Sequence, residues 1–337
     1  KIKKKKIKKN NEEFTTPIKL INHLKENDCP QFFLRLVKDV KNIKSPVEFE
    51  RRLKNSDIKI ISGLVDITNY ISNDSCRPLH VFDNDKIVGD IVIRHSKKGE
   101  KFTGLDDQDY ILDEGMIIIC DSKKILSLAG VIGGKESACS EETKNVLIES
   151  AYFLPEKISY SGRKLNILSD ARYRFERGID PESTIDGLEE ATSLILKHCG
   201  GIVGSIISDN KFDKTIKEIT VDKKCFSKIL GLEIESNFII SKLKELGCEV
   251  SEKNKDLIVV PPSWRPDIKI KEDLVEEIAR IYGFEKIPSQ KMSLTKNKKI
   301  NSVSNNFLLT NKLKKNLTSR NIMETITWSF LDKSIND

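Results

Sequence analysis

Four acidic side chains lie close together in the last third of the chain: Asp267, Asp273, Glu276 and Glu277. The last three are spaced i, i+3 and i+4, so on a helix they share one face. Like charges on one face repel one another unless a positive group neutralises them. Mg²⁺, which takes one or two carboxylates together with waters, is one such group. Basic side chains of this chain or of a partner are a second, and a solvated acidic face is a third.

A histidine and a glutamate stand in apolar surroundings. His80 lies between Leu79 and Val81, and Glu149 follows the apolar run 146–148. A lone histidine in such a run is most often a structural residue. An acid at the end of a strand that looks buried is less ordinary, because charged groups are seldom buried without a partner. A functional role therefore has more weight at Glu149 than at His80.

A glycine cluster, Gly130-Val131-Ile132-Gly133-Gly134-Lys135, invites comparison with a phosphate-binding loop. That loop needs Ser or Thr after the lysine to hold magnesium, and Glu136 stands there instead. The glycine spacing also differs. We therefore expect either a tight turn that needs positive φ or a turn that lets the backbone approach a small ligand.

The segment 169–178 packs three arginines beside two acids. An ion-paired structural turn is one interpretation. A strand is another, in which Ser169 and Ala171, two residues apart, would face the same pocket. Asn69, after an Asp-Ile-Thr run, is by itself most simply a turn residue.

The elements that must position these residues indicate a multidomain α+β fold. We expect a strand over 32–40, a helix that begins after Ser45-Pro46 with Val47, Phe49 and Leu53 on its apolar face, and a β-rich segment over 58–67. Short strands broken by turns follow over 86–127, then a helix over 181–199. Further on, the predicted elements are strands 218–221 and 257–260, helices 223–230, 236–246, 270–282 and 306–317, and a final strand 324–330.

Length and charge narrow the class of protein. The 337 residues exceed one ordinary domain. The formal net charge is +7, but seven lysines fall within the first ten residues, and the remainder is neutral with 51 basic and 51 acidic residues. This balance weighs against a chain that grips nucleic acid over its whole surface, and the lysine run reads as a solvated segment.

The chain has neither an apolar run of the roughly 20 residues that span a bilayer nor the pattern of a signal peptide. Seven scattered cysteines without a CxxC pair favour reduced thiols in the cytoplasm over a zinc site. The missing initiator methionine and the abrupt end predict a fragment of a longer protein.

Read together, several motifs resemble the β subunit of bacterial phenylalanyl-tRNA synthetase, and they stand in that family's order. The resemblance runs from about residue 28 to the end. The motifs are Val65-Asp66-Ile67-Thr68-Asn69-Tyr70, Arg77 to Asp83, Leu128 to Gly134, Tyr173 to Gly178, Pro261-Pro262-Ser263-Trp264-Arg265-Pro266-Asp267 and Glu272 to Gly283.

The resemblance implies four parts. They are a lysine-rich linker with the remnant of an N-terminal domain (1–44), a mixed α+β editing domain that binds tRNA (45–208), a small domain like a winged helix-turn-helix (212–288) and the start of a truncated, degenerate synthetase core (302–337). It also implies an α2β2 assembly in the cytoplasm. There the α subunit uses ATP to attach phenylalanine to its tRNA, and Asp267, Asp273, Glu276 and Glu277 belong to a Mg²⁺ site shared with α.

The resemblance further implies that the editing domain hydrolyses tyrosine mischarged onto this tRNA. The implied pocket residues are His80, Glu149, Gly130, Gly133, Asn69, Ser169 and Ala171. The chain departs from the family pattern at Ser169, usually Thr, and at Lys59, usually Arg. A freestanding editing hydrolase and a non-catalytic RNA-binding module are the alternatives.

Overall fold

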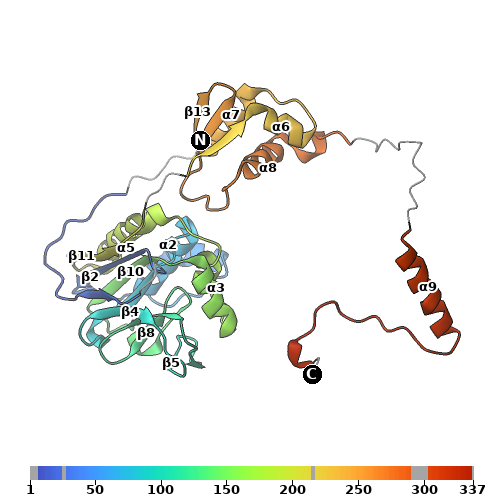
Figure 1. Ribbon diagram of the computed structural model, residues 1–337. Coiled ribbons are helices and arrows are strands. Elements are labelled where there is room, and N and C mark those ends of the chain that lie inside the picture. Colours follow the sequence, from blue (N-terminus) through green and yellow to red (C-terminus); the bar gives the residue numbers. More distant parts are fainter. Residues whose placement is uncertain (1–6, 25–27, 214–216, 290–302, 336–337) are drawn as a thin grey trace. The chain divides into compact units, whose positions relative to one another are not determined.

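The fold is mixed α+β, as predicted (Figure 1). The computed structural model describes residues 7–24, 28–213, 217–289 and 303–335. By its internal contacts the chain divides into residues 1–287 and residues 288–337. Among the described residues no helix combines the length and apolarity that crossing a membrane requires.

A four-stranded sheet in the order β11-β2-β10-β3 forms the centre of residues 28–210 (Figure 1). Its strands β2 and β10 are almost wholly buried, and apolar residues point to both faces of each, as in strands that are covered on both faces. All three pairings are antiparallel. The strands are β2 Gln31–Lys38, β3 His80–Asp83, β10 Val146–Tyr152 and β11 Ile202–Asn210.

Successive residues of β10 point to opposite faces of this sheet, and the two faces join different cores. Val146 and Ile148 pack in a cluster with residues of helices α2 and α5. Leu147 and Ala151 belong to the other cluster, so Glu149 points to that second face. The helices are α1 Val47–Asn55, α2 Gly63–Ser75, α3 Pro155–Lys164, α4 Asp170–Phe175 and α5 Thr184–Cys199.

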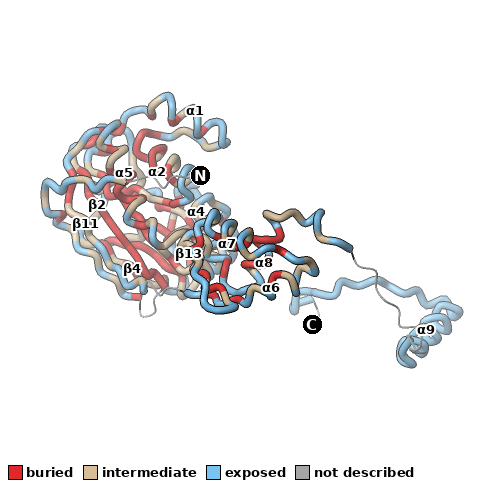
Figure 2. Tube along the Cα trace, turned by 90° about the horizontal axis from the view of Figure 1, so that it is seen from above, coloured by how far each residue is buried: buried red, intermediate tan, exposed pale blue. Residues whose placement is uncertain are grey.

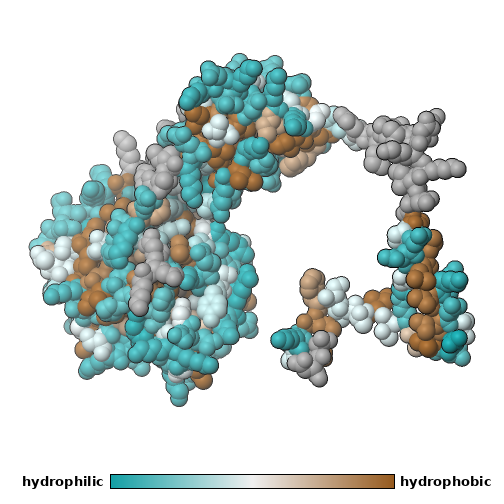
Figure 3. Space-filling model, viewed as in Figure 1, coloured by the Kyte–Doolittle hydropathy of each residue, from teal (hydrophilic) through white to brown (hydrophobic). Residues whose placement is uncertain are grey.

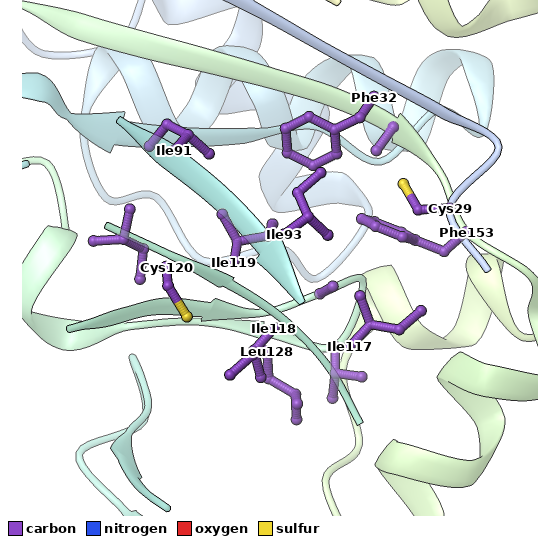
Figure 4. Packing of buried hydrophobic residues seen from close by; sticks show 14 of the residues in the cluster. Cys29, Phe32, Ile91, Ile93, Ile117, Ile118, Ile119, Cys120, Leu128 and Phe153 are labelled. Carbon is purple, nitrogen blue, oxygen red and sulfur yellow. The ribbon is translucent and has the colours of Figure 1, made fainter. Parts of the chain in front are cut away.

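The second core lies between this sheet and a five-stranded sheet in the order β1-β4-β7-β8-β9. Phe32 and Phe153 meet edge to face with ring centroids 6.3 Å apart, and Figure 4 shows them beside isoleucines of β4 and β7. The strands are β1 Leu20–Asn22, β4 Ile91–His95, β7 Ile117–Cys120, β8 Ile125–Leu128 and β9 Ile132–Gly133, with the hairpin β5 Lys101–Thr103 and β6 Asp109–Ile111. Short 3-10 turns span Asn84–Lys86, Lys135–Ser137 and Pro181–Ser183.

A separate small core is formed by three strands and three helices, as a winged-helix unit requires. The predicted helices and the strands at 218–221 and 257–260 are confirmed to within two residues, but strand β13, with the polar sequence EVSEK, was missed. The elements are β12 Ile219–Asp222, α6 Lys223–Leu230, α7 Ser236–Glu245, β13 Glu249–Lys253, β14 Asp256–Val260, α8 Lys271–Tyr282 and the 3-10 turn Phe284–Lys286.

The last part of the chain has one long helix, α9 Asn305–Thr318, as predicted, and the 3-10 turn Lys333–Ile335. The predicted strand over 324–330 is wrong: these residues form no strand and are exposed (Figure 2). Apolar side chains line α9 on the surface in view (Figure 3), and all five of its Phe and Leu residues are exposed within the described part of the chain. No strand forms over 324–330 because a strand without a neighbouring strand leaves its backbone N–H and C=O groups without partners.

Three further predictions need correction. The β-rich segment over 58–67 is wrong, since helix α2 begins at Gly63. Val47 is 82% exposed, so only Phe49 and Leu53 of the predicted face of α1 are buried. The domain boundary at 45 cuts through the fold, because β1 pairs with β4 and β2 lies between β11 and β10. Residues 20–38 thus belong to the first fold and are not the remnant of a preceding domain.

Candidate functional site

His80 and Glu149 face each other across two neighbouring strands. They are direct partners in the antiparallel pairing of β3 with β10. Glu149 is 6% exposed, and the Nε2 atom of the partly exposed His80 is itself buried. Neither that Nε2 nor Glu149 Oε2 has a hydrogen-bond partner among the residues that the structure describes. Buried polar atoms left unpaired are costly, so two of them side by side mark a place where a ligand or water would be held.

Burial sets the charge of both groups. It raises the pKa of Glu149 to about 8 and lowers the pKa of His80 to about 4. Both side chains are therefore mainly neutral at pH 7. A protonated carboxyl group can donate one hydrogen bond and still accept others. The pair can thus meet a neutral polar group of a ligand without a buried charge.

Gly133 forms a wall directly against the histidine. A Cβ at this position would lie 2.4 Å from His80 Cε1 and 2.7 Å from Nε2, closer than any real contact allows. The backbone at Gly133 therefore approaches a side chain of the site closely, and its approach to a ligand stays a prediction. Gly130, three residues earlier, has φ +64°, which agrees with the predicted turn. Glycine is thus favoured at position 133 by the nearby imidazole and at position 130 by the positive φ.

Ser169 joins this glycine loop to helix α4. Its Oγ accepts a hydrogen bond from Arg172 N at 3.1 Å and donates one to Val131 O at 2.5 Å. Of the two interpretations of this segment, the strand is wrong, because Ser169 caps α4 and Ala171 lies within its first turn. Ala171 packs against the core cluster that includes Val131. Ser169 and Ala171 therefore lie beside the glycine loop at the start of helix α4.

Replacing Ser169 with alanine is expected to lower the free energy of unfolding by about 1–3 kcal/mol. The helix loses its cap, and Val131 O, on a residue only 2% exposed, loses its donor. Threonine keeps the hydroxyl and is expected to stay within about 0.5 kcal/mol of the parent. Urea unfolding of the three proteins measures this, and an alanine variant as stable as the parent would contradict the assigned contacts.

Asn69 lies farther from the glycine loop and from the pair than the other predicted pocket residues do in the fold, because it belongs to helix α2. It lies half-buried on α2. Helix α2 packs with α5 in the cluster on the opposite face of the sheet from Glu149. No contact given for the described residues joins its side chain to His80 or Glu149. Its role in the pocket stays a prediction.

Arg77 is a residue of this neighbourhood whose role the sequence did not reveal. It is 1% exposed, and its guanidinium donates to Ala151 O at 3.0 Å and to Ser183 Oγ at 2.8 Å. These bonds tie the end of β10, which carries Glu149, to the turn before α5. The sequence offered one indication, because Arg77 stands beside Pro78 at the start of a mostly apolar run. An arginine that is buried in such a run needs hydrogen-bond acceptors.

The pair predicts how stability depends on pH. The pKa of Glu149 is raised in the folded state, so its contribution is present below about pH 4.5 and is lost as the pH rises through about 8. The lowered pKa of His80 has the opposite effect: its contribution to stability is present above about pH 6.5 and is lost as the pH falls through about 4. Between pH 6.5 and 8 the contribution of this pair changes through Glu149, and it is expected to lower the free energy of unfolding by up to about 1.4 kcal/mol per pH unit.

Glu149→Gln removes this group without changing its shape, so the variant is expected to lose less stability than the parent between pH 6.5 and 8. Urea unfolding at half-unit pH steps measures the difference. Parallel curves for the two proteins would show that Glu149 is ionised at neutral pH.

Whether the four acids of the small domain can bind a metal ion depends on which groups already donate hydrogen bonds to their carboxylates. Arg265 donates to Asp267 Oδ2 at 2.6 Å and to Glu277 Oε1 at 2.8 Å, and Arg280 donates to Glu277 Oε2 at 2.5 Å. Hydrogen bonds from Arg265 lower the pKa of both carboxyl groups. Basic neighbours, one of the alternatives drawn from the spacing, thus neutralise two of the four acids.

The other two acids do not complete a cluster. Asp273 Oδ2 accepts from the backbone N–H of Lys269 at 2.7 Å and of Ile270 at 2.9 Å, at the start of α8. Glu276 is exposed, whereas Glu277 is buried. Within the described ranges no three acidic, histidine or cysteine side chains are grouped as metal ligands. As arranged in this chain the four acids do not fit a metal ion, and the Mg²⁺ site stays a prediction.

The matches to known protein families cover the same two parts of the chain, the first domain and the small domain. Residues 28–200 match the model of the B3/4 domain, and residues 219–284 match that of the tRNA synthetase B5 domain. The phenylalanine–tRNA ligase beta subunit of Paramagnetospirillum magneticum is 41% identical over 308 residues, which cover 91% of this chain and 38% of the relative. That of Rhodopseudomonas palustris is 41% identical over 315 residues, or 90% of this chain and 38% of the relative.

A solved N-terminal fragment of the phenylalanyl-tRNA synthetase beta subunit from Pyrococcus horikoshii is similar at 17% identity, with a TM-score of 0.38 over 82% of this chain and 78% of that one. The chain spans about two-fifths of the length of the curated relatives it matches. The resemblance drawn from the motifs is confirmed by the two domain matches and by the curated relatives. The chain belongs to the B3/4 domain family, it also matches the tRNA synthetase B5 domain, and the curated relatives named above are phenylalanine–tRNA ligase beta subunits.

Proposed function

We propose that this chain is a section of a phenylalanine–tRNA ligase beta subunit whose first domain hydrolyses tyrosine mischarged onto the tRNA. The observation that carries the proposal is the pair of buried, unpartnered polar atoms, His80 Nε2 and Glu149 Oε2, on adjacent strands. The B3/4 match over residues 28–200 includes both residues. Such a pair suits a substrate that brings a polar group to these two buried atoms.

The pair gives each residue a distinct task. Glu149 hydrogen-bonds the phenol hydroxyl of tyrosine, which phenylalanine lacks. When phenylalanine enters, the carboxyl group stays buried and unpaired, and sites built in this way discriminate strongly against the missing hydroxyl. Neutral His80 orients the attacking water or the ester through Nε2, because an uncharged imidazole nitrogen can accept a proton. Gly133 keeps the imidazole in place.

The wider assignment concerns the whole protein. The beta subunit supports ATP-dependent attachment of phenylalanine to its tRNA together with a catalytic alpha subunit, in an α2β2 assembly of the cytoplasm. ATP binds to alpha. The Mg²⁺ proposed at Asp267, Asp273, Glu276 and Glu277 would require Arg265 to release its two carboxylates. The exposed apolar side chains of α9 are compatible with burial in a larger assembly.

Hydrolysis of two purified esters tests the editing role. The full chain is incubated with tyrosyl- and phenylalanyl-tRNA specific for phenylalanine, and release of each amino acid is followed. We expect tyrosine to be released at least about tenfold faster. Equal rates for both esters, or no release of either, would overturn the editing assignment. Co-purification of a chain of natural length with the alpha subunit tests the assembly separately.

A freestanding editing hydrolase is the second candidate. It needs only the first domain, and the B5 match together with the apolar surface of α9 weighs against it. A non-catalytic RNA-binding module using the lysine run is the third. That run lies at residues 1–10, of which 1–6 are outside the described residues. It predicts affinity for RNA that is lost when residues 1–10 are removed.

A further inference from the structure

Two large side chains at the start of α4 are exposed although they are apolar or aromatic. Leu168 is 87% exposed and Tyr173 is 57% exposed. Since Ser169 is the N-cap of α4, Leu168 is at N′ and Tyr173 at N4. At many helix starts these two positions lie on the same side of the helix. Both side chains are therefore exposed at the start of the same short helix.

A positive group extends this surface. The guanidinium carbon of Arg177 lies 3.7 Å from the centre of the Tyr173 ring, a stacked arrangement. We call Leu168, Tyr173 and Arg177 the α4 platform. Between residues 163 and 177 the chain has five basic and two acidic residues, whereas the chain after its first ten residues is neutral. The platform thus lies in a locally positive segment.

The platform is next to the candidate site. Leu168 precedes Ser169, whose Oγ binds Val131 O. Val131 is two residues from Gly133, and Gly133 lies directly against His80. A substrate whose phenol group reached Glu149 and whose ester bond reached His80 would therefore place the part beyond the ester near α4.

We propose that the α4 platform binds the unpaired nucleotides at the 3′ end of the tRNA, so that the terminal bases stack on Leu168, Tyr173 and Arg177. This inference rests on the proposed editing function and names the surface that holds its substrate. Stacked aromatic and arginine side chains beside positive charge suit single-stranded RNA, because every base has a flat face and every linkage a phosphate. Arg163, exposed at the end of α3, supplies a charge for a phosphate.

Binding of a short RNA tests the platform. The probe is a fluorescent single-stranded RNA that ends in CCA, titrated with the full chain and followed by anisotropy. The double variant Leu168→Ala, Tyr173→Ala is expected to bind about 5- to 150-fold more weakly, from one stacked base worth about 1–3 kcal/mol. The control is Val47→Ala on α1, because the Val47 side chain is nearly as exposed as that of Leu168. It should leave the Kd unchanged.

Charge gives an independent readout. Arg163→Gln is expected to reduce the slope of log affinity against log salt by about 0.7, the value for one phosphate of a single strand. Because these residues are exposed, the melting temperatures of all variants should match that of the parent. A double variant with the parent Kd would overturn the platform. So would a double variant that binds the RNA normally but loses a protein partner, since the surface would then be a protein interface.

The outcomes also separate this inference from the proposed function. If the parent prefers the tyrosyl ester and the double variant hydrolyses it with unchanged KM, the platform is wrong and editing stands. If the parent hydrolyses neither ester yet the double variant binds RNA more weakly, the platform stands without the editing function.

Discussion

Glu149→Ala is expected to reduce the preference for tyrosyl over phenylalanyl ester by about 10- to 100-fold, mainly through slower hydrolysis of the tyrosyl ester. The phenol hydroxyl would enter a buried pocket without its partner, which costs about 1–3 kcal/mol. The phenylalanyl ester makes no such bond and no longer leaves a carboxyl group unpaired, so its hydrolysis should stay the same or rise. The ratio of kcat/KM for the two esters is the quantity that measures discrimination.

Glutamine at the same position distinguishes two forms of the hydrogen bond. Since the pKa of Glu149 is raised to about 8, the group that meets tyrosine at pH 7 is a neutral carboxyl. Glutamine, also neutral and of the same shape, should keep more of the preference than alanine does. A glutamine variant as poor as alanine would mean that the ionised carboxylate is required. Glu142→Gln, the same change at an exposed position, serves as the control.

The parts of the fold that the sequence predicted well are those whose signals are local. Helix α6 was predicted with its observed bounds. Asp222 caps its start through Lys224 N at 2.8 Å, and Gly231 ends it in the left-handed conformation. Both signals lie within the segment itself. The same holds for α8, whose apolar residues recur at helical spacing and are buried.

The errors have a different cause. Helix α2 contains β-branched residues that favour a strand, but Asp66, wholly buried, accepts a hydrogen bond from Ile61 N at 2.9 Å and one from Ser45 Oγ at 2.5 Å. The contact with Ser45 comes from another segment and cannot be read from the local pattern. Likewise, the local pattern left a turn and a strand open at Ser169, because its hydrogen-bond partner, Val131 O, is distant in the sequence.

The site itself was beyond local reasoning. His80 and Glu149 are common residue types in apolar runs, and only the pairing of β3 with β10 makes them neighbours. The family resemblance named both, but not the absence of hydrogen bonds at His80 Nε2 and Glu149 Oε2 in the described structure. For the acids of the small domain the helical spacing was right, yet it did not reveal that Arg265 bridges Asp267 and Glu277.

Gly133→Ala is expected to abolish hydrolysis of the tyrosyl ester, with a loss of at least about 100-fold, while the chain still folds. The new methyl group would overlap the imidazole of His80, at 2.4 Å from Cε1, and the ring would have to leave its position. Small errors in the placement of a reacting group are costly in rate. The overpacking should also lower the free energy of unfolding by about 1–3 kcal/mol.

Gly99→Ala separates the two effects. Gly99 has φ +86° and open space where a Cβ would be, so alanine there strains the backbone without touching the site. That variant should lose stability but keep hydrolysis, whereas Gly133→Ala loses both. Ester hydrolysis and urea unfolding measure the two quantities on the same preparations. If Gly133→Ala hydrolysed the tyrosyl ester at the parent rate, the position of His80 would be irrelevant to the reaction, and the role assigned to its Nε2 would be wrong.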